Sequence, residues 1–410
     1  MPLFATQFLG AFNDSLFKQG VVLFVTYQLY SNAAKEFQFS AIAQGLFILP
    51  FFLFSALAGQ LADDHDKSKI IRIVKLCEIG IMILGGAGIM LANIPLMLAA
   101  VCLMGVHSTF FGPIKYAILP QHLHKDEVLG GTGLVEAGTY IAILGGTILA
   151  GILAPSPEIA AATTIGIAVL GYFAGRQVPP APPSAERIPF NWHIIRASVQ
   201  LVSATLHIPR LFLAICSISF FWTIGAVLII IFPPLVKNVL GADEQFASLF
   251  IAIFSIGIAI GSVLINRLLK SEVSARYAPA SVIAMGVFVL LLHFVARAWG
   301  EHGVELTTLG NFLFNPMAGL MILALLGVAI TGGMFVVPLY AFLTTTVPKT
   351  ETARTVAANN IVNSGAMVIG SLVAFALSSA GVGPVGQLLL VASMCLVSAW
   401  LGWKLHLACD

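Results

Sequence analysis

Four ionisable side chains lie inside long apolar stretches of this sequence. Asp14 and Lys18 are one helical turn apart in the first stretch, Lys115 follows Gly112-Pro113 in the fourth, and Glu136 lies in the fifth. If such stretches cross a membrane, each charge held there costs roughly 2.5–3.5 kcal/mol on insertion scales. A charge retained at that cost is a candidate for binding an ion or a charged ligand.

Each of these charges also has a structural explanation. Asp14 and Lys18 lie on one helical stripe and can form an ion pair that only orders their own helix. Lys115 can extend to the membrane interface or pair with Glu136. Glu136 can also make a hydrogen bond between two helices. The sequence alone leaves these alternatives open.

Polar and aromatic neighbours extend the candidate binding site. Thr132, Glu136 and Tyr140 recur at one-turn spacing, which predicts a polar stripe on one helix face. Asn363, one turn from Asn359, holds the position related to Glu136 in the second half of the chain. The two halves are therefore expected to present a carboxylate and an amide in related places. The remaining candidates are Asn13 and Trp222.

Other residues with chemical potential are interpreted as structural. Glu78 is expected to reach the loop beside the third apolar stretch, and His107 is expected to pack between helices. The spacing of the five cysteines fits neither a zinc site nor a disulfide framework. The sequence has no Gly-Lys-Ser/Thr phosphate loop and no cluster with metal-ligand spacing. We therefore expect no cofactor, no metal and no catalytic residue.

The composition places these residues in a membrane protein. Of 410 residues, 59% are apolar and only 9% are charged, against roughly 25% charged in a soluble domain. So few charges cannot cover the surface of a water-soluble globule. A soluble enzyme, a disordered chain and a secreted disulfide scaffold are therefore excluded. The net charge of +2, without a long basic patch, excludes a nucleic-acid binder.

The apolar stretches are continuous rather than alternating, which predicts membrane-spanning α-helices instead of a β-barrel. Lys and Arg gather in the segments that alternate spans place on one side, which predicts cytoplasmic N- and C-termini. Lys75 is counted among these cytoplasmic charges. The predicted spans are 3–30, 40–62, 70–92, 95–119, 128–153, 158–175, 210–236, 245–268, 277–297, 316–344, 354–379 and 384–405.

A polar interruption divides the twelve predicted spans into six and six. Residues 176–189 are rich in proline and predict a linker. The residues that follow predict an amphipathic helix in the cytoplasmic interface, because their apolar side chains recur at steps of three and four. We therefore expect a six-helix bundle over 1–175, a linker with an interfacial helix over 176–209, and a second six-helix bundle over 210–410.

Short matches relate the two halves as a repeat. Residues 132–138 match 359–365, and 116–119 match 340–343 in the same order. The segment 59–63 (GQLAD), followed by Lys67, resembles the motif between spans 2 and 3 of the major facilitator superfamily, although Asp64 and Asp66 depart from it. That resemblance implies an all-α membrane fold of two pseudo-symmetric bundles. It also implies a conformational latch at Gly59, Asp63 and Lys67, and a solvated loop is the alternative.

Five further segments carry a resemblance that covers nearly the whole chain. They are 6–14 (TQFLGAFND), 112–119 (GPIKYAIL) and 133–137 (GLVEA) in the first half, and 219–222 (SFFW) and 332–339 (GGMFVVPL) in the second. These segments are similar to those of the bacterial lysophospholipid transporter family within the major facilitator superfamily. Asp14, Lys115 and Glu136 lie within matched segments, so the resemblance implies that they bind substrate. Lys18 and Asn363 lie beside such segments.

The resemblance implies a transporter rather than an enzyme. Members of that family move lysophospholipids, such as lysophosphatidylethanolamine and lysophosphatidylglycerol, across the bacterial inner membrane for reacylation on the cytoplasmic side. The partners expected from it are a lysophospholipid, membrane lipids and a cytoplasmic acyltransferase, which is either a separate protein or a domain beyond residue 410. We expect the transporter itself to be a monomer that works by alternating access.

Two other functions are compatible with the residues. One is a proton-coupled exporter of drugs or small solutes, in which Glu136 and Asp14 carry protons. The other is a membrane domain that serves an acyltransferase without transporting anything.

Overall fold

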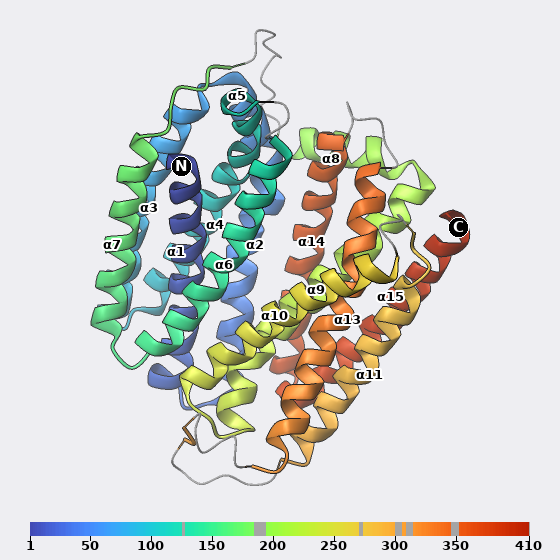
Figure 1. The fold of residues 1–410 in the computed structure, drawn as a ribbon. Coiled ribbons are helices and arrows are strands. Elements are labelled where there is room, and N and C mark those ends of the chain that lie inside the picture. The colour runs from blue at the N-terminus through green and yellow to red at the C-terminus, as the bar shows by residue number, and fades with distance from the viewer. Residues whose placement is uncertain are drawn as a thin grey trace. The chain divides into compact units, whose positions relative to one another are not determined.

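Helices make up nearly all regular structure in this computed structural model, which describes residues 1–124, 128–183, 194–269, 274–299, 306–308, 315–345 and 352–409 (Figure 1). Among these residues, ten helices are long and apolar enough to cross a membrane, and a shorter apolar segment spans Gly138–Leu153. The all-α membrane fold predicted from the composition is confirmed.

The first half of the chain forms α1, continued by one π-helical turn, and then α2 to α7. Their bounds are α1 Pro2–Phe24, η1 Val25–Leu29, α2 Ala33–Asp64, α3 Lys67–Met90, α4 Ile94–Ala117, α5 Leu119–His122, α6 Val128–Leu153 and α7 Pro157–Arg176. The short α5 follows α4, and the other six helices each overlap one of the first six predicted spans.

The second half begins with the predicted amphipathic helix and continues with six long helices. Their bounds are α8 Ile194–Leu206, α9 Pro209–Asn238, α10 Glu244–Leu268, α11 Ala278–Arg297, α13 Ala318–Thr345, α14 Thr352–Ser379 and α15 Pro384–Cys409. Each of the six long helices overlaps one of the last six predicted spans.

The second long helix is longer than its apolar run. The sequence predicts a start at residue 40, but α2 begins at Ala33. The extra turns contain Glu36, whose side chain is fully buried and accepts a 2.6 Å hydrogen bond from Lys237 Nζ at the end of α9. Because this charge is paired inside the protein, the helix extends beyond its apolar residues.

By its internal contacts, the chain divides into two compact units. The first comprises Met1–Leu29 and Leu46–Ser198, and the second comprises Tyr30–Gly45 and Val199–Asp410. The division falls within α2, whose first turns pack with the second unit through Glu36 and Lys237.

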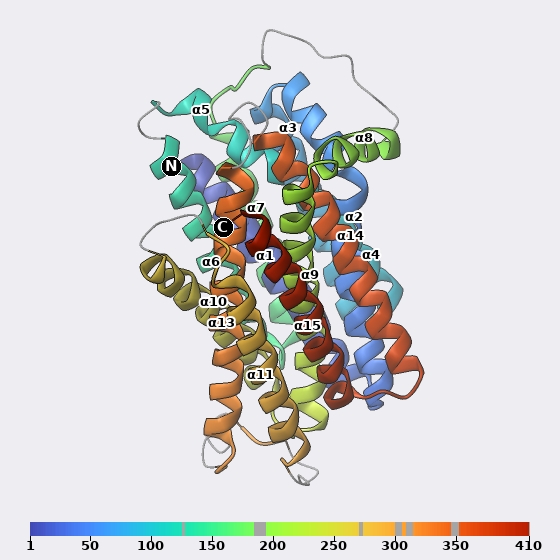
Figure 2. The ribbon, with the colours of Figure 1, turned by 90° about the vertical axis from the view of Figure 1, so that its right-hand side faces the viewer.

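Equivalent helix pairs pack together in the two units (Figures 1 and 2). In the first unit α1 packs against α6 and α7, and α3 packs against α4 and α7. In the second unit α9 packs against α14 and α15, and α11 packs against α13 and α15. These pairs correspond one to one when α1 is matched with α9 and the rest follow in order. The pseudo-symmetric repeat predicted from the short sequence matches is therefore confirmed.

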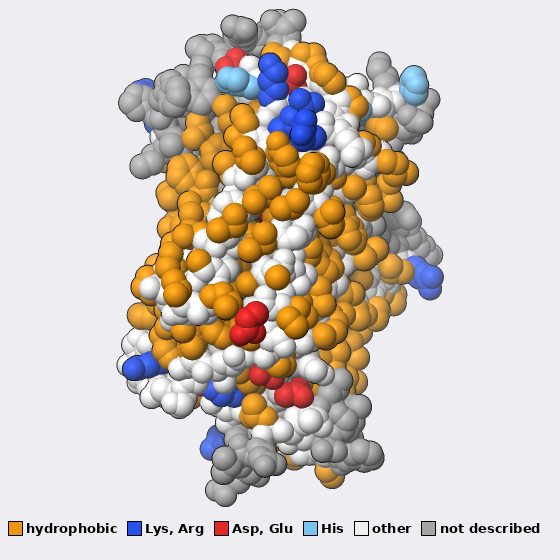
Figure 3. Space-filling view, turned by 90° about the vertical axis from the view of Figure 1, so that its left-hand side faces the viewer, with side chains coloured by type: hydrophobic (Ala, Val, Ile, Leu, Met, Phe, Trp, Pro, Cys, Tyr) orange, Lys and Arg blue, Asp and Glu red, His pale blue; other side chains and the backbone are white. Residues whose placement is uncertain are grey.

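Apolar side chains cover the middle of the face in Figure 3, and a group of Lys and Arg side chains lies at its upper end. In the first unit, α3 and α7 expose large apolar side chains that no aqueous surface would favour. They include Ile73, Leu76, Ile83, Ile159, Leu170 and Phe173. Such a surface suits a lipid environment, because the hydrocarbon core carries no penalty for exposed apolar groups.

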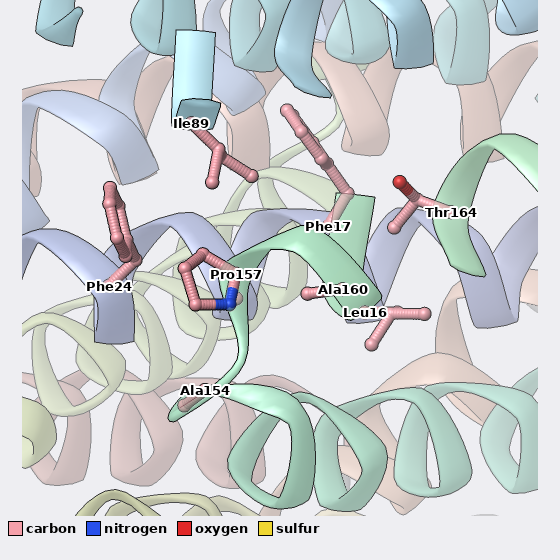
Figure 4. A pocket seen from close by; sticks show the side chains of 9 residues that line it. Leu16, Phe17, Phe24, Ile89, Ala154, Pro157, Ala160 and Thr164 are labelled. Atoms are coloured by element: carbon pink, nitrogen blue, oxygen red, sulfur yellow. The ribbon is translucent and has the colours of Figure 1, made fainter. Parts of the chain in front are cut away.

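A small cavity lies among α1, α3 and the start of α7 (Figure 4). Its walls include Leu16, Phe17, Phe24, Ile89 and Pro157, so they are mostly apolar. Its volume is about 10 Å³, which leaves room for roughly one water molecule at most. The cavity contains none of the predicted site residues and is too small for a lipid.

The loop between α2 and α3 is held by Asp66, one of the two departures from the superfamily motif. Its carboxylate caps α3 by accepting hydrogen bonds from the N–H and hydroxyl of Ser68, both 2.9 Å, and it accepts a third from Ala181 N–H at 3.1 Å. Burial alone would raise the pKa of Asp66, but these hydrogen bonds hold the pKa below its ordinary value of 3.8. The carboxylate therefore joins the start of α3 to the segment after α7.

Acidification should weaken this cap. Because the folded-state pKa of Asp66 is lowered, its contribution to stability is complete above the ordinary carboxyl pKa of about 3.9 and is lost as the pH falls through the lower folded value. We expect Asp66→Ala to cost about 0.5–2 kcal/mol at pH 7. Asp66→Asn keeps a capping oxygen but does not titrate. The difference in thermal unfolding midpoint between wild type and Asp66→Asn in detergent should therefore shrink between pH 7 and pH 3, and a constant difference would contradict this account.

Candidate functional site

A buried ion pair forms the centre of a polar network in the first unit. Lys75 and Glu78, one turn apart on α3, are 0% and 1% exposed, and Lys75 Nζ donates to Glu78 Oε2 at 2.6 Å. Asn13 Nδ2 of α1 donates to Glu78 Oε1 at 2.9 Å, and His107 Nε2 of α4 lies 3.3 Å from Glu78 Oε2. One carboxylate therefore contacts side chains from two neighbouring helices as well as its own.

Glycines make the space for the Lys75 ammonium group. A Cβ atom on Gly10 of α1 would lie 2.6 Å from Lys75 Nζ, closer than any van der Waals contact allows. Cβ atoms on Gly171 and Gly175 of α7 would also touch the Lys75 side chain, at 3.7 and 3.4 Å. The missing side chains on α1 and α7 therefore form a slot that the lysine fills. Its ring neighbour is Phe111, whose centroid lies 5.3 Å from Nζ.

Asp14 lies at the edge of this network. Its Oδ2 accepts a hydrogen bond from the Ser108 hydroxyl of α4, and Ser108 Oγ lies 3.5 Å from His107 Nδ1. Its Oδ1 is shielded from solvent and has no hydrogen-bond partner among the described residues. A carboxylate oxygen in this state requires a donor, because a buried charge without one is costly. Asp14 therefore has an acceptor position available for a ligand that donates a hydrogen bond.

Lys115 belongs to a second polar group in the same unit. Its Nζ lies 3.5 Å from Thr139 Oγ1 of α6, and Thr139 Oγ1 lies 2.8 Å from Gln7 Oε1 of α1. Gln7 Nε2 is buried without a partner among the described residues. Helices α1, α4 and α6 thus bring one ammonium group and one unsatisfied amide together, a combination that suits an anionic ligand.

The other predicted residues of the first unit are placed less centrally. Lys18 Nζ lies 4.6 Å from the centroid of the Phe47 ring, a cation–π geometry. Tyr140 is 58% exposed on α6. The side chains of Thr132 and Glu136 lie outside the described residues, so the polar stripe predicted through them stays a prediction.

Three of the predicted residues in the second unit meet at one tyrosine. Trp222 Nε1 donates to Tyr340 Oη at 2.8 Å, and the side-chain amides of Asn359 and Asn363 lie 3.5 and 3.4 Å from the same oxygen. Ser219 donates to Asn363 Oδ1 at 2.7 Å. The second unit therefore has a polar cluster built from α9, α13 and α14, in which uncharged groups replace the charges of the first unit.

The residues of the predicted latch are described in part. Lys67 is 2% exposed, and its backbone N–H donates to Ala181 O at 3.0 Å. A Cβ atom on Gly59 would meet nothing within 4 Å. The side chain of Asp63 lies outside the described residues. The latch stays a prediction, and the carboxylate of Asp66 accepts three of the hydrogen bonds described for this loop.

The sequence analysis misses the pairing of Lys75 and Glu78. Lys75, counted among the cytoplasmic charges, and Glu78, expected to reach the loop, are buried against each other. His107 packs between helices as expected, stacked on Phe111, and it also lies between Glu78 and Ser108. The available signal was the spacing of Lys75 and Glu78, since opposite charges three residues apart on an apolar helix can pair.

Comparison with known proteins identifies the family. A family model described as Major Facilitator Superfamily matches residues 3–371. The chain belongs to the major facilitator superfamily. It is therefore a multi-pass membrane transporter rather than an enzyme, as the sequence predicted. Among the residues that the structure describes, no group of three or more His, Cys, Asp or Glu could hold a metal ion.

Relatives and solved structures resemble most of the chain. A lysophospholipid transporter LplT of Citrobacter koseri is 27% identical over 374 residues, covering 90% of this chain and 86% of the relative. The LplT of Salmonella newport is 26% identical, covering 90% and 85%. The crystal structure of a nucleoside transporter covers 98% of both chains with a TM-score of 0.73 and 13% identity. This structural likeness supports the fold alone.

Proposed function

We propose that this major facilitator superfamily member transports lysophospholipids across the bacterial inner membrane. The relatives named lysophospholipid transporters cover most of the chain and support this substrate class. The observation that carries the proposal within the molecule is the presence, in one unit, of two buried polar atoms without a hydrogen-bond partner among the described residues. Asp14 Oδ1 has no donor there, and Gln7 Nε2, which lies near Lys115 through Thr139, has no acceptor.

A lysophospholipid head group has matching chemistry. Its phosphate is an anion that an ammonium group and an amide can bind, so we assign it to Lys115 and Gln7. The ammonium of lysophosphatidylethanolamine donates hydrogen bonds, so we assign it to Asp14, with Asn13 and Lys18 beside it. Glu136 and Tyr140 of α6 complete this head-group site in the first unit. Trp222, Asn359 and Asn363 are further candidate substrate-binding residues, in the second unit.

Transport would proceed by alternating access as a flippase, with the lysolipid delivered for reacylation on the cytoplasmic side. The two six-helix bundles that we propose, 1–175 and 210–410, are joined by the linker 176–209 with α8 in the cytoplasmic interface. Gly59, Asp63 and Lys67 would stabilise one state. The functional form is a monomer with cytoplasmic termini. Its partner is an acyltransferase, on a separate chain or as a domain after residue 410.

Substitution of the two head-group residues tests the proposal. The purified chain is reconstituted into vesicles, and the movement of fluorescent lysophosphatidylethanolamine between leaflets is followed by chemical quenching. We expect Lys115→Ala and Asp14→Ala each to lower kcat/KM by about 10- to 100-fold, because a hydrogen bond to a charged group contributes roughly 1.5–3 kcal/mol. The control is Gly20→Ala on α1, where a Cβ meets nothing within 4 Å.

Wild-type rates in both variants would remove the assigned roles. Transport of small cationic solutes that depends on an imposed pH gradient, with no lysolipid movement, would instead identify a proton-coupled exporter.

A further inference from the structure

Glu78 contacts α1 and α4 at equivalent points. It accepts a hydrogen bond from Asn13 on α1 and lies 3.3 Å from His107 on α4. The next residue on each helix is Asp14 and Ser108, and these two are hydrogen-bonded to each other. The Glu78 carboxylate on α3 thus contacts α1 at Asn13 and α4 at His107. On each helix this contact lies one residue before the hydrogen bond between Asp14 and Ser108.

Filling this buried part of the first unit does not require an ion pair. Glu78 and Lys75 are 1% and 0% exposed, and replacing such a pair with apolar residues is often neutral or stabilising. A buried ion pair is therefore a candidate for fixing one arrangement of the helices among several. Here the glycine slot at Gly10, Gly171 and Gly175 holds Lys75 from α1 and α7, so Glu78 is positioned relative to three neighbouring helices, α1, α4 and α7.

We propose that Glu78 is a positioning residue that sets the register between α1 and α4 and so aims Asp14 Oδ1, which has no partner among the described residues, at the ammonium group of a lysolipid. This inference rests on the proposed function. Glu78 itself touches no substrate, because its two oxygens are occupied by Lys75, Asn13 and His107. Its effect is on head-group selectivity: an ammonium head group needs Asp14 in place, whereas a glycerol head group has no ammonium to bind there.

Head-group selectivity in vesicles tests the inference. Lys75→Met/Glu78→Leu removes both charges and leaves no unpaired ion. In this variant we expect kcat/KM for lysophosphatidylethanolamine to fall about tenfold or more, the effect of one lost hydrogen bond to a charged group. The value for lysophosphatidylglycerol, measured on the same preparation, should change by less than about threefold. Gly20→Ala again serves as the neutral substitution on α1.

A double-mutant cycle separates positioning from a general structural role. In an Asp14→Asn background, Lys75→Met/Glu78→Leu should cause no further loss of selectivity, because both changes remove the same interaction. An equal loss for both lysolipids, or additive losses in the cycle, would overturn the inference. If wild type moves neither lysolipid, the proposed function fails instead.

A cross-linking measurement tests the register without transport. With the native cysteines replaced by serine, Asp14→Cys/Ser108→Cys should be bridged rapidly by a short thiol-specific reagent. Adding Lys75→Met/Glu78→Leu should slow this reaction at least fivefold. An unchanged rate in a variant that remains folded would show that Glu78 does not set the register.

Discussion

Replacing Lys75 with methionine is expected to lower the free energy of unfolding by about 3–5 kcal/mol. The substitution fills the glycine slot with a side chain of similar length but leaves Glu78 ionised inside the protein. Asn13 and His107 still contact Glu78, but they do not replace the ammonium group of Lys75 beside a buried carboxylate. Few other single substitutions in the first unit should cost as much.

The matched control is the variant that removes both charges. Lys75→Met/Glu78→Leu should recover most of the stability, because it leaves no unpaired ion. The measurement is a denaturant titration of the purified protein in detergent, followed by tryptophan fluorescence and checked by size-exclusion chromatography. A single variant as stable as wild type, or a double variant less stable than the single one, would contradict the ion-pair account.

The second large effect is expected at a glycine between two helices of the second unit. A Cβ atom on Gly261 of α10 would lie 1.9 Å from the backbone oxygen of Ile330 on α13. A backbone atom cannot rotate away as a flexible side chain can, so α10 and α13 must separate. Overpacking of this kind costs typically 1–3 kcal/mol and occasionally more, and we expect Gly261→Ala to lie at or above the upper end.

Gly225→Ala provides the contrast in the same unit. A Cβ at Gly225 of α9 would meet nothing within 4 Å, so alanine there should stabilise the helix by roughly 1 kcal/mol at most through its higher helix propensity. Thermal unfolding in detergent should therefore shift in opposite directions for the two substitutions. Equal shifts would indicate that close packing of α10 on α13 does not decide the effect.

Much of the fold follows from the sequence, because lipid imposes simple rules. Continuous apolar runs must form helices in a bilayer, and all twelve predicted spans overlap long helices. The small-residue pair Gly257 and Gly261 also predicts close packing, and the structure places both against α13. The exception is the start of α2. Its first turns include Lys35, Glu36 and Gln38, and the tertiary contact between Glu36 and Lys237 holds a charge there that the apolar pattern does not predict.

The candidate site was less predictable, because its contacts depend on how helices are rotated about their axes. Asp14 and Lys115 are conspicuous as single charges in apolar runs. Lys75, Glu78 and His107 come from two helices, and nothing local indicates that they face Asn13 of α1. The glycine slot is equally hidden, since Gly10 and Gly171 meet Lys75 only after α1, α3 and α7 have packed.

The most direct measurement of the central claim is lysolipid movement by the wild-type chain in protein-containing vesicles. Fluorescent lysophosphatidylethanolamine is placed in both leaflets, and the fraction that an impermeant quencher reaches is followed with time. The account predicts that the protein accelerates the exchange of lysolipid between leaflets well above protein-free vesicles, while a diacyl phospholipid with the same head group stays slow. Identical rates with and without protein would contradict it.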